Sequence, residues 1–203
     1  MDIIPIGFLY TFFGPSSAPL LDLSNICSSS GNGVFPGTKL ANCAFLAEDI
    51  KYCQSKGKAV TLSLGGASAK VGFDSDQQAL QFADTVWDMF LGGNGAVRPF
   101  GDAILDGCVQ VPPRSAEEQR LTRLCRVDLD IESGKPDHYA AFVNSIRSRA
   151  LTTAPVRKYY ITAAPQCVFP DEYIGDALSS VPFDAIYVQF CTPFIPFLPI
   201  LPR

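Results

Sequence analysis

Val127-Asp128-Leu129-Asp130-Ile131-Glu132 alternates apolar and acidic residues over six positions. Successive side chains of a strand point to opposite faces, so this pattern predicts a strand with three carboxylates on one face. In a parallel strand covered by helices both faces are buried, and repulsion between buried carboxylates raises the pKa of at least one of them. In this way a glutamic acid can be kept protonated near neutral pH and act as a general acid. A solvated acidic edge strand or an oxygen-ligand metal site gives the same pattern, and the hexapeptide alone slightly favours these alternatives.

Outward from this strand, apolar runs alternate with segments of helical periodicity. Strands separated by helices imply parallel βα units and an α/β fold, and we count five strands. On one of the expected helices Leu80, Ala83, Trp87, Phe90 and Leu91 lie at helical spacing, which predicts that they share one apolar face. Trp87, the single tryptophan, is predicted to be a core residue. The expected strands are residues 3–13, 59–64, 103–107 with 127–132, 158–164 and 185–190, and the expected helices are residues 40–55, 75–91 and 136–150.

Composition excludes several kinds of function. The 203 residues correspond to one domain, or to one domain and part of another. With 16 basic and 20 acidic residues the net charge is −4, so nucleic acid is not an expected partner. A single histidine, His138, excludes zinc sites that need two or three histidines, and we expect no metal and no cofactor. No apolar run reaches the roughly 20 residues of a membrane helix, so we expect no membrane span.

The first residues and the cysteines give conflicting indications about the compartment in which the protein folds. The chain enters an apolar run directly and its first basic residue is Lys39, so we expect no signal peptide. Seven cysteines nevertheless indicate a compartment in which disulfides form, and their odd number leaves at least one thiol over. Together these features suggest an incomplete chain.

Two segments do not fit the alternation of strands and helices. Residues 108–126 hold four of the nine arginines and no lysine. Residues 191–203 place proline at every third position from 193 to 202 between large apolar residues, which excludes a helix and a central strand. A polyproline-like tail fits this spacing, although such tails are normally polar.

Removing residues 108–126 joins Leu105-Asp106-Gly107 to Val127 and restores an Asp-Gly-x-Asp-x-Asp-x-Glu motif. Further short motifs occur in a consistent order: Ser63-Leu-Gly-Gly66, Ala163-Ala-Pro-Gln-Cys167 and Tyr187-Val-Gln-Phe190. With these motifs the sequence resembles glycoside hydrolase family 18, and in particular the hevamine-type (class III) chitinases of fungi. The resemblance covers residues 1–107 and 127–190.

The resemblance implies a (β/α)8 TIM barrel with its site at the carboxyl ends of the strands. Only strands two to six of that barrel are expected, with the first strand upstream of Met1 and strands seven and eight missing. Residues 1–190 would then be a partial catalytic domain, interrupted by the insertion 108–126 and followed by an aberrant tail, 191–203. Retained intron sequence and a divergent paralogue with a surface insertion both explain these segments.

The resemblance also implies an activity, which is hydrolysis of the β-1,4-N-acetylglucosamine linkages of chitin. Family 18 enzymes retain the anomeric configuration and use the acetamide group of the substrate as the nucleophile. The implied residue roles are Glu132 as the acid, Asp130 as the group that orients the acetamide, Asp128 and Asp106 as groups that tune Asp130, and Gln189 as a hydrogen-bonding partner of the sugar. Cys191 stands where the family has a tyrosine that positions the acetamide.

For the cysteines, geometry excludes one pairing and the resemblance implies another. Cys43 and Cys53 would lie about 15 Å apart on a continuous helix, too far for a disulfide. The family pattern implies a Cys27–Cys43 bridge and leaves Cys53 and Cys167 without partners.

The expected partner is chitin or a chito-oligosaccharide. Full-length relatives are expected to be monomers, and the intact parent protein is expected outside the cell or in the cell wall. The alternatives are a non-catalytic chitin-binding or inhibitor barrel and an inactive fragment of a chitinase. Such non-catalytic relatives usually lose the acidic glutamate, which this chain keeps as Glu132.

Overall fold

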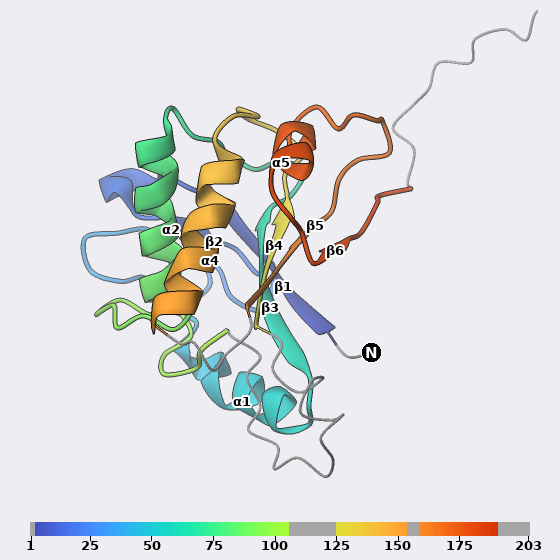
Figure 1. Ribbon diagram of the computed structural model, residues 1–203. Helices are drawn as coiled ribbons and strands as arrows, with labels where there is room; N and C mark the ends of the chain where they lie inside the picture. Colours follow the sequence, from blue (N-terminus) through green and yellow to red (C-terminus); the bar gives the residue numbers. More distant parts are fainter. Residues whose placement is uncertain (1–2, 106–124, 154–158, 191–203) are drawn as a thin grey trace, which may run out of the picture.

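The computed structural model describes residues 3–105, 125–153 and 159–190, and its central feature is one mixed sheet (Figure 1). The strand order is β2-β1-β3-β4-β5-β6; every neighbouring pair is parallel except β2 and β1. The strands are β1 (Ile3–Thr11), β2 (Leu20–Leu21), β3 (Ala59–Gly65), β4 (Cys125–Asp130), β5 (Tyr159–Ala163) and β6 (Ala185–Ile186). The predicted α/β class is confirmed. Within the described residues the sheet keeps two edges, as part of a barrel does.

Helices cover this sheet, and α2 and α4 lie side by side on one of its flanks (Figure 1). The helices are α1 (Ala47–Ser55), α2 (Asp76–Phe90), α4 (Tyr139–Thr153) and α5 (Gly175–Ser180), with short 3-10 turns at η1 (Pro15–Ser17) and η2 (Ala44–Leu46). None of the helices in the described part of the chain is long and apolar enough to cross a bilayer.

Three expected elements differ from those observed. The helix expected over 40–55 begins only at Ala47, because Leu40–Cys43 is held in a loop by a disulfide and by a bond from the Cys43 amide to the Pro99 carbonyl (2.9 Å). β2 lies in a region expected to be loop. Residues 103–105 form no strand, because the Leu105 amide donates to the Phe90 carbonyl (2.8 Å) instead of a ladder partner; residues 106–107 lie outside the described part.

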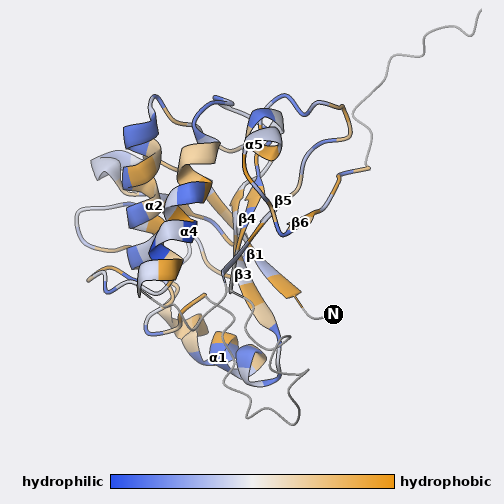
Figure 2. Ribbon diagram, viewed as in Figure 1, coloured by the Kyte–Doolittle hydropathy of each residue, from blue (hydrophilic) through white to orange (hydrophobic). Residues whose placement is uncertain are grey.

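The core lies between the sheet and the α2–α4 pair. All seven residues of β3 are buried, as a central parallel strand requires. The rings of Phe12, Phe73, Phe82 and Phe142 stack or tilt against one another at centroid separations of 4.3 to 5.9 Å. Figure 2 shows hydrophobic residues on the strands and on the side of α2 that faces the sheet, with hydrophilic residues on its outer side.

On α2, one predicted core residue is confirmed and another is wrong. Trp87 is buried and packs on Tyr159, with ring centroids 5.0 Å apart. Leu80, expected on the same face, is 45% exposed. The buried positions of α2 are 79, 82, 83, 86, 87 and 90, a stripe of helical period that passes one position away from Leu80.

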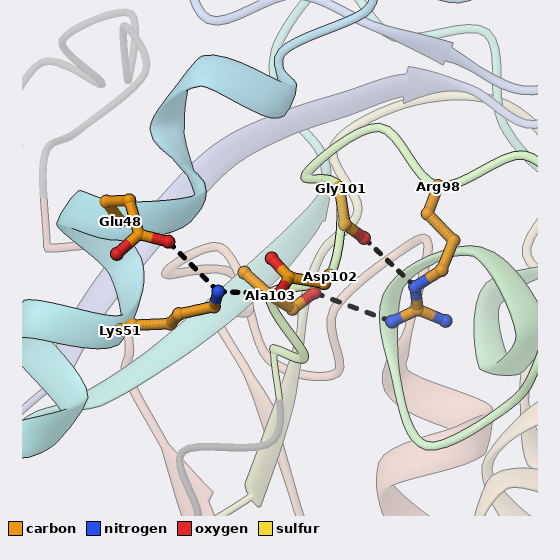
Figure 3. Close-up of polar contacts among 6 residues, drawn as sticks. All are labelled: Glu48, Lys51, Arg98, Gly101, Asp102 and Ala103. Carbon is orange, nitrogen blue, oxygen red and sulfur yellow. Dashed lines mark hydrogen bonds and ion pairs between the residues drawn. The ribbon is translucent and has the colours of Figure 1, made fainter.

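The chain from 98 to 105 is anchored before the first undescribed internal segment (Figure 3). Arg98 donates to the Gly101 carbonyl (3.2 Å) and to the Ala103 carbonyl (3.5 Å). Lys51 of α1 forms an ion pair with Asp102 (2.6 Å). Arg98 also donates to the Asp88 carbonyl of α2 (2.6 Å), so these contacts bind this loop to α1 and to the end of α2.

The structure contains the disulfide that the resemblance implies. Cys27 and Cys43 are bonded with their Cα atoms 5.9 Å apart, and both are fully buried. Cys53 and Cys167 are free thiols. The predicted insertion falls mostly outside the described residues, although its last two positions, 125 and 126, begin β4. The predicted tail, 191–203, lies wholly outside them.

Candidate active site

Asp128 lies at the centre of the candidate site, held between two neighbouring strands. The register aligns Ser63 of β3, Asp128 of β4 and Thr162 of β5 at one level. The Ser63 hydroxyl donates to Asp128 Oδ2 (3.0 Å), and the Thr162 hydroxyl donates to Oδ1 (2.6 Å). All three residues are buried, so each oxygen of the Asp128 carboxylate has a fixed donor.

Asp130 ends β4 one level above, where the site opens. Its Oδ1 accepts a hydrogen bond from Gln189 Nε2 (2.6 Å), which also donates to the Ala164 carbonyl (3.0 Å). Burial, followed by the charges of Glu132 and Asp128, raises the pKa of Asp130 to about 7; the Gln189 hydrogen bond acts in the opposite direction. The raised pKa in this row therefore belongs to an aspartate, whereas the sequence argument sought it on a glutamic acid.

A close approach of backbone to backbone supports this end of β4. Gly65, the last residue of β3, has φ +116, and a Cβ atom there would lie 2.1 Å from the Asp130 carbonyl oxygen. The next amide, Gly66 N–H, donates to the same oxygen (2.7 Å). The Ser63-Leu-Gly-Gly66 motif thus supplies a hydroxyl for Asp128 and a side-chain-free contact for Asp130.

The prediction that Glu132 lies on the strand is wrong, because Glu132 follows the end of β4. β4 ends at Asp130 because its neighbours, β3 and β5, end at Gly65 and Ala163 and offer no further ladder partner. Glu132 is half-buried, and its Oε2 accepts from Gln166 Nε2 at 3.4 Å. The apolar side chains that alternate with the carboxylates, at 127, 129 and 131, are buried as predicted.

Four of the five predicted site residues meet at one edge of the sheet: Asp128, Asp130, Glu132 and Gln189. Asp106 lies outside the described residues, as does Cys191. β6 is shorter than predicted, and Gln189 lies beyond its end. The backbones of Gln189 and Gln166 form an isolated parallel β-bridge.

Sequence reasoning assigned no role to Ser63, Thr162 or Gln166. Ser63 and Gln166 lie in the motifs Ser63-Leu-Gly-Gly66 and Ala163-Ala-Pro-Gln-Cys167, and these motifs could have identified them as site residues. Thr162 carried none, because its role depends on strand register.

The neighbouring cavity is separate from the carboxylate row. It measures about 680 Å³ and lies between the β5–α5 loop and β6, with Val168, Phe183 and Ile186 among its apolar lining. Gln166 lines it, but none of the three carboxylates does. We therefore place the site by its chemistry and not by this cavity. Among the described residues, no group of three or more His, Cys, Asp or Glu side chains is arranged to hold a metal ion.

The fold and the site define a class of protein: an α/β protein of parallel βα units that carries a row of carboxylates at the carboxyl ends of its strands. Residues 24–192 match the glycosyl hydrolases family 18, and the chain belongs to that family.

Known relatives agree with this assignment. The chain is 42% identical to chitinase 2 of Rhizopus oligosporus over 190 aligned residues. The alignment covers 94% of this chain and 30% of that protein. Among solved structures it resembles the ICChI chitinase of Ipomoea carnea, with a TM-score of 0.72 and 35% identity over 93% of this chain and 58% of that one. It also resembles the xylanase and alpha-amylase inhibitor protein XAIP-II of Scadoxus multiflorus (TM-score 0.68, 34% identity, covering 93% of this chain and 56% of that one). The chain thus spans about a third of the curated relative and somewhat over half of the solved ones.

Proposed function

We propose that residues 1–190 form part of a family 18 catalytic domain that hydrolyses the β-1,4-N-acetylglucosamine linkages of chitin. Residues 108–126 would be an insertion in that domain and 191–203 a tail outside it. The observation that carries the proposal is that the three carboxylates of the row differ in their surroundings. Both oxygens of Asp128 accept a hydrogen bond from a hydroxyl group, Asp130 has a raised pKa, and Glu132 is half-buried.

In the first step Glu132 donates its proton to the glycosidic oxygen. The bond from the anomeric carbon to that oxygen breaks, and the acetamide oxygen of the same sugar bonds to the anomeric carbon, giving an oxazolinium ion. In the second step water attacks the anomeric carbon, the acetamide oxygen departs, and a proton of the water returns to Glu132. Two displacements at one carbon retain its configuration.

Asp130 supplies the electrostatic part of this mechanism. Its ionised form is unfavourable in the free site, because burial and two neighbouring carboxylates oppose it. A positive charge developing on the acetamide would relieve that repulsion. The Asp130 carboxylate therefore interacts more strongly with the transition state than with the ground state, which is the condition for rate acceleration. Asp128, locked by two hydroxyls, fixes the strand beneath it.

The substrate would be chitin or a chito-oligosaccharide, which full-length relatives would bind as monomers. The intact protein would act outside the cell or in the cell wall, as a chitin-degrading enzyme must reach its polymer.

A second candidate is a binding or inhibitor barrel without turnover. The likeness to XAIP-II, a xylanase and alpha-amylase inhibitor, shows that this fold also serves inhibition. The retained Glu132 and its amide donor favour hydrolysis.

Two assays on the unaltered chain separate these functions. Release of reducing ends from colloidal chitin, together with capture of the chain on chitin beads, is expected of the hydrolase. Capture without release supports the binding barrel. If the chain neither releases reducing ends nor binds to the chitin beads, the proposal is overturned.

A further inference from the structure

Two adjacent glutamines each present an amide to one carboxylate of the site. Gln166 Nε2 lies 3.4 Å from Glu132 Oε2, and Gln189 Nε2 lies 2.6 Å from Asp130 Oδ1. Their backbones form a parallel bridge, in which the Gln189 amide donates to the Pro165 carbonyl (2.9 Å). The two side chains are therefore positioned as a pair above the ends of the strands.

A buried carboxylate holds Gln166 in this place. Asp171 is 7% exposed, and its Oδ2 accepts the backbone N–H of Gln166 at 2.7 Å. Its Oδ1 accepts the backbone N–H groups of Tyr173 (2.8 Å) and Ile174 (2.7 Å). Three charge-assisted bonds to one buried side chain fix the loop that carries Gln166.

We infer that Gln166 is a positioning residue for the acid Glu132; the inference rests on the proposed function. An amide N–H donates more favourably to the carbonyl oxygen of a carboxyl group than to its hydroxyl oxygen, so the bond to Oε2 favours Oε1 as the oxygen that carries the proton. Gln166 thus selects which oxygen of Glu132 faces the glycosidic bond. A bond of 3.4 Å is long, as hydrogen bonds of a catalytic site often are before substrate closes it.

The contact can be tested without turnover by following the side-chain amide of Gln166 in ¹H–¹⁵N NMR spectra. The resonance is expected to move in Glu132→Gln, which replaces the carboxyl group that Gln166 contacts by an amide. It is expected to stay in place in Glu172→Gln, a matched change at an exposed site of the same loop. A Gln166 resonance that does not respond to Glu132→Gln overturns the inference.

The role in proton donation can be tested through the leaving group. Gln166→Met keeps the length of the side chain and removes the donor, while Gln81→Met on the exposed face of α2 is the control. General acid catalysis contributes about 10²- to 10⁴-fold, and losing its alignment is expected to cost about 10-fold in kcat on chitotetraose. The KM should stay within about two-fold, since sugar binding is unchanged. On 2,4-dinitrophenyl chitobioside, whose leaving group needs no proton, kcat should fall less than about two-fold. Equal losses on both substrates, or no loss, overturn the inference.

Glu132→Gln on the same two substrates distinguishes this failure from failure of the proposed function. If Glu132→Gln loses chitotetraose turnover selectively and Gln166→Met does not, only the positioning role is wrong. If Glu132→Gln affects both substrates equally or neither, Glu132 is not the acid, and the proposed function and the positioning role fail together. An unaltered chain that turns over neither substrate has the same consequence.

Discussion

Asp130 ends β4 with a carboxyl group whose charged form is disfavoured in the free protein. Burial contributes most to this, and Glu132 and Asp128 add repulsion. The single donor from Gln189 does not compensate. Such a group is costly to the fold, and its position beside the proposed acid indicates that the cost serves function.

Stability should therefore depend on pH through Asp130. Because its pKa rises from 3.8 to about 7 on folding, the folded chain binds this proton more tightly than the unfolded chain. The resulting stabilisation is complete below about pH 4 and is lost as the pH rises through about 7. Asp130→Asn lacks this titration. Urea unfolding of both proteins from pH 4 to 8 should show the unaltered chain losing stability relative to the variant, and a constant difference would contradict the raised pKa.

The donors to Asp128 should matter for stability as well. Thr162→Val keeps the shape of a buried side chain and removes the hydroxyl bonded to Asp128 Oδ1. Leaving a buried carboxylate oxygen without its donor is expected to lower the free energy of unfolding by about 1–3 kcal/mol. The control is Thr152→Val, because the Thr152 hydroxyl bonds only within the exposed surface of α4. Chemical denaturation should show a clearly larger loss for Thr162→Val, and equal losses would speak against the Asp128 network.

At the scale of elements, the contact between the ends of β3 and β4 depends on Gly65. Alanine there would combine an unfavourable φ of +116 with a Cβ placed 2.1 Å from the Asp130 carbonyl. We expect a loss of at least about 3 kcal/mol in unfolding free energy. Gly37→Ala tests the backbone strain alone, since Gly37 has φ +75 and open space around it; about 1–2 kcal/mol is expected. Similar losses in the two variants would show that the close approach is unimportant.

The sequence predicted central elements better than peripheral ones. The β3 and β4 runs were found because continuous or alternating apolar patterns identify buried strands. β2 was missed, since two residues give no periodicity. Glu132 was placed on β4 because alternation continues past Asp130, whereas the strand ends where β3 and β5 end.

At the scale of the whole molecule, the disulfide closes a long loop across residues 28–42. The sequence separation of Cys27 and Cys43 is 16, and a crosslink of this size contributes about 3 kcal/mol. Replacing both cysteines by serine should lower stability by about this amount in thermal or urea unfolding. Cys53→Ser, at a free and half-buried thiol, should lose clearly less. Equal stability of the double variant and the unaltered oxidised chain would contradict the bridge.

The assembly of the site could be predicted only in part. Asp128, Asp130 and Glu132 are encoded locally, by alternation along one strand. Their partners come from β3, from β5 and the loop after it, and from the segment that follows β6. Residues of different strands reach one level only through the register of the sheet. Motif resemblance selected Gln189, which lies at this edge, but it could not show that Ser63 and Thr162 hold Asp128.

The central claim is that Glu132 is the acid of a chitin-hydrolysing site, and one comparison tests it most directly. Reducing-end release from chitotetraose is measured for the unaltered chain, for Glu132→Gln and for Glu172→Gln as the exposed control, with unfolding curves recorded for all three. Glutamine keeps the size and most of the hydrogen bonding of glutamate but carries no acidic proton. We predict that Glu132→Gln loses at least about 100-fold in turnover with its unfolding curve nearly unchanged, while Glu172→Gln keeps full turnover. Turnover by Glu132→Gln equal to that of the unaltered chain would contradict the account.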